Sequence, residues 1–310
     1  MTAYAKSATA ALGLALLLLG QQPASAAEAC TQIYARSQSL GSEGAPHQWK
    51  VLFEAATAAA DCDEAFRRAL GRKTAVAIYN NVQVRLSAGV EVAELEAPLN
   101  ESLSYFHLWQ PLAMLGDLHR ENRQYPQAAR RYEDALQTIA DEELTPTGPP
   151  SETIAAIFHK AEETRLLAGE YIVSTRSRSG EPAGLAARSI RGFVPTKVAV
   201  PVTFEYNSDA FTSDGLAAAK DMMEYLKAQG AGGITVIGHT DPRGSASYNL
   251  ALSETRARAL ADYLKENGYP GTVNAVGKGE SEPFIPDDPG RYSDEQRWQM
   301  DRRVDLQRGP

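Results

Sequence analysis

Two different spacings of hydrophobic residues divide the chain. Between residues 28 and 170, apolar and small residues recur every three or four positions, the spacing of amphipathic helices, and no stretch alternates as a strand does. Gly, Pro or Asn stands at the breaks. This part is therefore predicted to be all-α. The predicted helices begin at Cys30 and then cover about residues 49–60, 73–87, 92–103, 106–122, 125–141 and 151–169.

From Val198 onward, short strand patterns alternate with helical ones. Residues 198–206 alternate apolar and polar positions, and Pro201 means that pairing begins after it or that the strand lies at a sheet edge. Thr212 or Ser213 can cap the helix that follows. Further strands are predicted at 234–237, 273–276 and 303–307, with a helix over about 252–264. The order predicts a βαβαββ sandwich around one sheet.

Basic residues dominate the segment between the two parts. Residues 172–197 hold Arg176, Arg178, Arg188, Arg191 and Lys197 against one acidic residue. We expect a flexible, solvated basic linker. An anionic partner, such as a cell-wall polymer or lipid headgroups, is the alternative.

The first 26 residues have the features of an export signal. Lys6 is their only charge, the apolar run from Ala8 to Gly20 is 13 residues, and Ala24-Ser25-Ala26 is a signal-peptidase pattern. A membrane-spanning helix needs about 20 apolar residues. A cleaved signal peptide over 1–26 is therefore expected. An uncleaved anchor and lipid attachment at Cys30 are the alternatives.

Composition and charge narrow the function classes. The hydrophobic fraction is 43% and the charged fraction 23%, ordinary for a globular chain, and the net charge is −8. An acidic chain is a poor general binder of nucleic acid. The five histidines are scattered, no nucleophile–base arrangement can be identified, and no phosphate-binding loop is present. We therefore predict no metal, no cofactor, no nucleic-acid partner and no enzymatic activity.

The only two cysteines can form a disulfide. If the first two helices form an antiparallel hairpin, the start of the first lies beside the end of the second, which places Cys30 near Cys62. An oxidising compartment permits the bond. Two unrelated buried thiols are the alternative.

One stretch of the helical part resembles a tetratricopeptide repeat. Leu115-Gly116 falls where one helix needs a small residue for close approach, and Ala128, Tyr132 and Ala135 share a face of the next helix. Leu112 and His119 depart from the repeat pattern, and no second copy is equally clear. The resemblance implies a protein-binding groove, and plain helical packing is the alternative.

The C-terminal part carries a longer motif. Ile237-Gly-His-Thr-Asp241-Pro-Arg-Gly244-Ser-Ala-Ser-Tyr248-Asn249 is followed by Leu252-Ser253-Glu-Thr-Arg256-Ala257. With 204–208, 277–283 and 301–304, it resembles the OmpA-like peptidoglycan-binding domain over about residues 198–308. The resemblance implies a ligand pocket formed by Asn207, Asp241, Asn249, Arg256, Arg302 and Arg303.

The chemistry of the central pair suits a zwitterion. Asp241 follows a strand at its carboxyl end, where α/β sheets gather ligand sites. If Ser253 caps a helix, Arg256 lies in the first turn of that helix, where unpaired N–H groups favour an anion. One continuous helix from about residue 246 would instead place Arg256 further from Asp241. A carboxylate and a guanidinium can hold an ammonium and a carboxylate. The family implies the diaminopimelate of Gram-negative peptidoglycan as the ligand. An internal Asp241–Arg256 salt bridge is the alternative.

These features predict four segments: a signal peptide (1–26), an all-α tetratricopeptide-like domain (27–171), a basic linker (172–197) and an OmpA-like domain (198–310). The expected protein is periplasmic and bound to the cell wall, with the outer membrane as a candidate location. It docks noncovalently on peptidoglycan and holds a helical domain that binds an envelope protein partner. An envelope enzyme localised by the C-terminal domain, or a pure helical scaffold, is the alternative.

Overall fold

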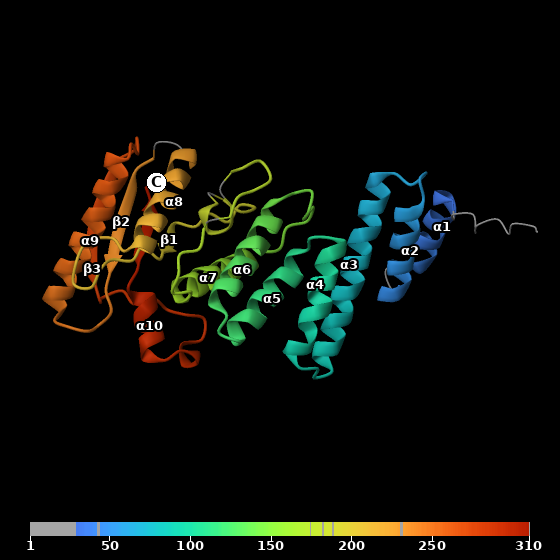
Figure 1. Ribbon diagram of the computed structural model, residues 1–310, viewed down its shortest axis with the longest axis horizontal. Coiled ribbons are helices and arrows are strands. Elements are labelled where there is room, and N and C mark those ends of the chain that lie inside the picture. The colour runs from blue at the N-terminus through green and yellow to red at the C-terminus, as the bar shows by residue number, and fades with distance from the viewer. Residues whose placement is uncertain are drawn as a thin grey trace, which may run out of the picture.

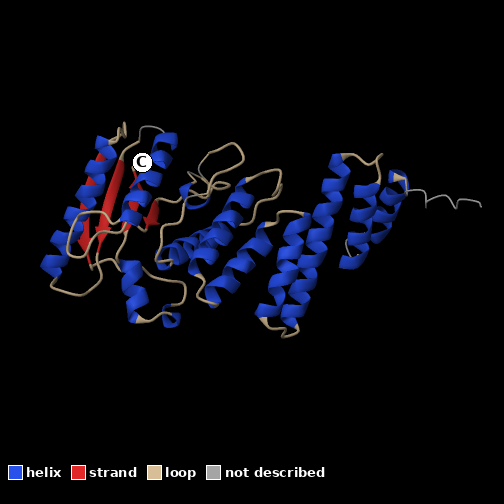
Figure 2. Ribbon diagram, viewed as in Figure 1, coloured by secondary structure: helices blue, strands red, loops and turns tan. Residues whose placement is uncertain are grey.

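The computed structural model describes residues 29–41, 44–173, 175–181, 183–187, 189–229 and 232–309 (Figure 1). The predicted signal peptide lies outside these residues. A row of helices leads to an α/β unit at the other end, and the described strands all lie in that unit (Figure 2). The predicted fold class, all-α followed by α/β, is confirmed. None of the helices in the described part of the chain combines the length and the apolar character that a membrane span requires.

The helical region holds seven α-helices and one 3₁₀ helix up to residue 167, within the described ranges. Their bounds are α1 Cys30–Leu40, α2 Pro46–Ala58, α3 Glu64–Ser87, η1 Val92–Leu95, α4 Glu96–Tyr105, α5 Trp109–Glu121, α6 Tyr125–Ala140 and α7 Ser151–Leu167. The helices lie within a few residues of the prediction, except that α3 begins earlier, at Glu64. Asp63 explains that start, because its carboxylate accepts the Phe66 N–H at 2.7 Å and so caps the helix.

The pair α5–α6 packs as the sequence predicted. A Cβ on Gly116 would lie 2.6 Å from the Tyr132 ring, so only glycine permits this approach. Ala128, Tyr132 and Ala135 are fully buried on one face of α6. The Tyr132 hydroxyl donates to Asp117 at 2.7 Å, which satisfies the polar end of the buried ring.

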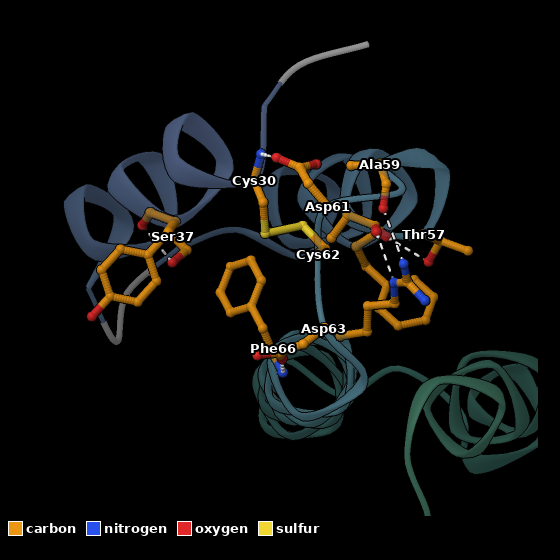
Figure 3. Close-up of a disulfide and its surroundings, with 12 residues drawn as sticks. Cys30, Ser37, Thr57, Ala59, Asp61, Cys62, Asp63 and Phe66 are labelled. Carbon is orange, nitrogen blue, oxygen red and sulfur yellow. Dashed lines mark hydrogen bonds between the residues drawn. A yellow bond between two sulfur atoms is a disulfide. The ribbon is translucent and has the colours of Figure 1, made fainter.

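Cys30 and Cys62 form a disulfide, with their Cα atoms 5.1 Å apart (Figure 3). Cys30 opens α1, and Cys62 lies in the turn between α2 and α3. The Cys30 N–H also donates to the Asp61 carboxylate at 2.9 Å, which secures the same corner. The predicted pairing is confirmed, and the bond leaves no thiol on Cys30 for lipid attachment.

Removing this disulfide should destabilise the N-terminal end of the chain. In the chain-entropy model a loop of this length contributes about 3–4 kcal/mol, so a Cys30→Ser/Cys62→Ser variant should unfold at lower denaturant concentration. Hydrogen exchange should localise the loss to α1 and α2. Thiol labelling of the unreduced, denatured wild-type protein is the control. Two reactive thiols there would contradict the pairing.

The described residues of 172–197 are partly buried against the helices, contrary to the expectation of a flexible, solvated linker. Leu185 and Ile190 join the core formed by α6 and α7. The short helix η2 Gly184–Ala186 lies in this segment. Arg178 pairs with Asp141, and Arg191 donates to the Ile139 carbonyl at 3.0 Å. Arg178 therefore neutralises the charge of Asp141 at the C-terminal end of α6, and Arg191 caps a carbonyl of its last turn. Their spacing in the sequence did not predict these contacts.

The α/β unit has a mixed four-stranded sheet in the order β1-β4-β2-β3. β2 and β3 are parallel, and β4 runs antiparallel to both β1 and β2. The strands are β1 Lys197–Val200, β2 Ile234–His239, β3 Val273–Gly279 and β4 Val304–Arg308. The helices are α8 Ser213–Gln229, α9 Ala246–Glu266, η3 Pro289–Arg291 and α10 Asp294–Asp301. The helix α10, between β3 and β4, is an addition to the predicted order.

β1 is an edge strand, as Pro201 allowed, but it is shorter than predicted. It ends at Val200 because Pro201 has no N–H to continue a ladder. Of the two alternatives that Pro201 left open, the edge position is confirmed and pairing after Pro201 is wrong, since Phe204 forms only an isolated bridge to Phe211. The Thr212 side chain caps α8 by accepting the Gly215 N–H at 3.0 Å.

Helices cover both faces of the sheet. α8 and α9 pack on Val236, Val304 and Leu306. The opposite face is covered by α7 and α10. There Ala199 packs with Leu166 and Leu167 of α7 and with Met300 of α10, because successive side chains of a strand point to opposite faces of the sheet. The last helix of the helical region is thus part of the core of the α/β unit.

A buried carboxylate joins the two parts. Glu163 of α7 is fully buried and accepts from Arg120 of α5 at 3.1 Å and from the Asp287 N–H at 2.8 Å. The Tyr292 hydroxyl also donates to it. Nearby, Gln296 of α10 donates to the Tyr125 hydroxyl at 2.8 Å. The loop before α10 and α10 itself are therefore fixed on the helical region.

Candidate functional site

Asp241 lies just beyond the carboxyl end of β2, in the loop that leads to α9. The Thr240 N–H donates to the Gly279 carbonyl at 3.0 Å, which ties the loop to the end of β3. Gly244 has φ +112°, a conformation that side chains disfavour, and so permits the turn. Ser245 then caps α9 by accepting the Tyr248 N–H at 3.3 Å. The loop therefore holds Asp241 in a fixed position.

Two arginines bind the Asp241 carboxylate. Arg243 donates from Nη2 at 2.7 Å, and Arg302 donates from Nη1 at 2.8 Å. Although burial favours the protonated form, the hydrogen bonds from Arg243 and Arg302 hold the pKa of Asp241 at about 2. The carboxylate is therefore charged throughout the physiological range.

Arg256 extends from the middle of α9. Its Nε donates to the Ser208 carbonyl at 3.0 Å and its Nη2 to the Glu205 carbonyl at 3.2 Å. Its guanidinium carbon lies 5.3 Å from the centre of the Phe204 ring. Burial lowers the pKa of Arg256 from its usual value. These contacts use two of its five N–H donors and aim the guanidinium along the 204–208 loop.

The interpretation of Ser253 as a helix cap is wrong. α9 is one continuous helix from Ala246 to Glu266, and Ser253 is fully buried inside it. The Ser253 hydroxyl donates to the Leu250 carbonyl at 2.8 Å and accepts the Gly279 N–H at 2.8 Å. Arg256 therefore reaches the site by its length, without help from a helix N-terminus.

Asp241 and Arg256 line one cavity of about 210 Å³ without pairing with each other. Among the described residues, the Asp241 ion pairs are those with Arg243 and Arg302, so the alternative of an internal Asp241–Arg256 salt bridge is wrong. The cavity brings together five of the six predicted pocket residues. They are Asn207, Asp241, Asn249, Arg256 and Arg302.

Arg303, the sixth predicted residue, is buried beside this cavity. Its Nε donates to Asp305 at 2.8 Å, and its guanidinium lies over the Phe284 ring. It lines an adjoining cavity of about 250 Å³ together with Arg243, Arg256 and Arg302. Arg303 does not line the Asp241 cavity itself, whereas its neighbour in sequence, Arg302, does.

Asn249 and Asn207 form part of the wall of the Asp241 cavity. Asn249 donates to the Asp241 carbonyl at 3.2 Å and also to the Glu280 carboxylate. Asn207 has φ +53°, a left-handed conformation that asparagine tolerates, and its side-chain oxygen accepts from the Tyr248 hydroxyl. Sequence reasoning did not assign roles to Tyr248, Glu280 or Arg243. Their proximity to Asp241 in the motif was the only signal for Tyr248 and Arg243.

His239 is directed at a different partner. Its Nε2 lies 3.1 Å from the Asp305 carboxylate, and both side chains are buried. The neighbouring His239 and Arg303 groups lower the pKa of Asp305 although burial opposes this. Within the described ranges, no cluster of three or more His, Cys, Asp or Glu side chains could hold a metal ion.

The mixed sheet and this acid-and-arginine cavity define an OmpA-like domain, and comparisons with known proteins agree. The OmpA family matches residues 203–297. The peptidoglycan-associated lipoprotein of Rhizobium meliloti is 32% identical over 120 residues, which are 38% of this chain and 68% of that protein. The chain belongs to the OmpA family.

The match to another relative spans a smaller share of that protein. The peptidoglycan-associated lipoprotein of Pseudomonas putida is 36% identical over 106 residues, which are 34% of this chain and 60% of that protein. A crystal structure of the peptidoglycan-associated lipoprotein from Burkholderia pseudomallei is 30% identical, with a TM-score of 0.30, and covers 38% of this chain and 92% of that one. The family match lies in the C-terminal part of the chain, at residues 203–297, after the helical region.

Proposed function

We propose that this chain binds peptidoglycan noncovalently through the cavity at Asp241. One observation supports this most: a buried, ionised carboxylate and the Arg256 guanidinium line the same cavity. The ammonium of diaminopimelate would bind Asp241, and its neighbouring carboxylate would bind Arg256. The names of the relatives, which describe association with peptidoglycan, support the same ligand class.

In this proposal the helical domain is the second functional part. The close α5–α6 packing around Gly116 is what a tetratricopeptide-like unit requires, and such units bind other proteins along their helices. The disulfide supports a location in an oxidising compartment, for which the periplasm is our proposal. The protein would then dock on the wall and hold an envelope protein there, without catalysing a reaction.

Sedimentation with purified sacculi tests the wall-binding part. The full-length protein should pellet with sacculi that contain diaminopimelate and stay in the supernatant with sacculi that contain lysine at that position. The comparison holds the glycan constant and changes one carboxylate. Equal pelleting with both, or pelleting with neither, would reject the proposal.

A further inference from the structure

The hydrogen-bonding capacity of the Asp241 carboxylate is fully used by the protein itself. Its Oδ1 accepts from the Arg243 backbone N–H at 3.1 Å and from Arg243 Nε at 3.2 Å. Its Oδ2 accepts from Arg243 Nη2 and from Arg302 Nη1. A carboxylate offers about four acceptor sites. An ammonium group can therefore bind Asp241 well only if a guanidinium moves away.

Arg243 is the arginine placed to move. Its side chain is 56% exposed, whereas that of Arg302 is 34% exposed and extends directly from the end of α10. Arg302 also donates to Glu295 at 3.3 Å, which holds it on α10. Arg243 is therefore less enclosed than Arg302, and the hydrogen-bond acceptor that its side chain would lose is the Asp241 carboxylate.

Arg243 also contacts α10 while it is bound to Asp241. Its guanidinium carbon lies 5.0 Å from the Trp298 ring centre, and its Nη1 lies 3.8 Å from a Glu295 oxygen. A guanidinium that leaves Asp241 can therefore keep a stacked aromatic partner and an acidic one. Leaving Asp241 therefore costs Arg243 its hydrogen bonds to that carboxylate but not its contacts with α10.

We infer that Arg243 is an intramolecular competitor of the ligand: it occupies Asp241 until an ammonium-bearing ligand displaces it, and it then keeps only its contacts with Trp298 and Glu295. This inference rests on the proposed function. It makes Arg243 a residue that sets affinity and selectivity, because only a cation that binds Asp241 better than a guanidinium from the same loop can enter. Weakly binding amines would be excluded.

The test is calorimetric titration of the full-length protein with a diaminopimelate-containing muropeptide. An Arg243→Gln variant should bind more tightly than wild type, by about tenfold or more, since the two charged hydrogen bonds from Arg243 Nε and Nη2 no longer compete for Asp241. Arg258→Gln is the matched control. Arg258 lies on α9, is 59% exposed and pairs with Glu254, so its loss changes the net charge equally. Its affinity should stay at the wild-type value.

The outcomes separate this inference from the proposed function. If Arg243→Gln binds more weakly, Arg243 is a direct ligand contact and the competition is wrong. If it binds as wild type does while Asp241→Asn does not bind, the competition is also wrong but the proposed function stands. If Asp241→Asn binds as tightly as wild type, the proposed function fails. An Asp241→Asn/Arg243→Gln variant that regained tight binding would overturn both.

Discussion

Replacing Asp241 by asparagine should weaken binding to a diaminopimelate-containing muropeptide by roughly ten- to more than a hundredfold. A hydrogen bond to a charged group contributes about 1.5–3 kcal/mol, and each 1.4 kcal/mol is about tenfold in affinity. The substitution keeps the shape of the side chain and removes its charge. Titration of the full-length protein with the muropeptide measures the dissociation constant. The difference between wild type and Asp241→Asn gives the contribution of the contact between Asp241 and the ligand ammonium.

The control for this prediction is another acidic residue of the same domain. Asp262 on α9 is 56% exposed and pairs with Lys265, so Asp262→Asn removes one charge far from the carboxyl ends of the strands. It should bind as wild type does. Circular dichroism should show both variants folded. Arg256→Lys should also bind more weakly, because an ammonium lacks the planar fork that reaches the Ser208 and Glu205 carbonyls. A folded Asp241→Asn protein with unchanged affinity would contradict the proposed contact.

Replacing Glu163 by alanine should destabilise the contact between the helical region and the α/β unit by about 3–5 kcal/mol. That is the usual effect of removing one partner of a buried ion pair, since the other charge stays buried. Arg120, the Tyr292 hydroxyl and the Asp287 N–H all lose an acceptor. Thermal unfolding of the full chain measures the loss.

Limited proteolysis shows where the destabilisation acts. Cleavage within residues 283–293 should accelerate in Glu163→Ala, because this loop is held by the lost contacts. Glu152→Ala, at an exposed position in the first turn of α7, should leave proteolysis of that loop unchanged. Equal melting temperatures and equal cleavage rates for wild type and Glu163→Ala would show that the contact does not hold the two parts together.

Local chemistry explains what could be predicted from the sequence. The need for glycine at Gly116 and the pairing of Cys30 with Cys62 follow from helix geometry and hairpin order, and both are confirmed. The resemblance to the OmpA-like domain named six pocket residues, and five of them line the Asp241 cavity. That they bind a ligand stays a prediction. α10 also had a visible signal, since Ser293 and Gln296 form a capping box.

Contacts distant in sequence explain the failures. Ser253 is a good cap by type, but its hydroxyl is used inside α9 by Leu250 and by Gly279 of the neighbouring strand. The 172–197 segment is basic in composition, yet its apolar residues fill a gap beside α6 and α7. Glu163 meets partners 124 and 129 positions away. Neither periodicity nor composition carries that information.

The contact between α7 and β1 also protects the sheet from other molecules. The outer side of an edge strand presents unpaired backbone groups that can recruit a strand from another copy. Here the Glu162 carboxylate accepts the Ala199 N–H at 2.7 Å, and burial raises the pKa of Glu162 to about 8. The helix thus occupies the position that an incoming strand would need. In the full chain, α7 therefore blocks this edge of the sheet from pairing with a strand of another molecule.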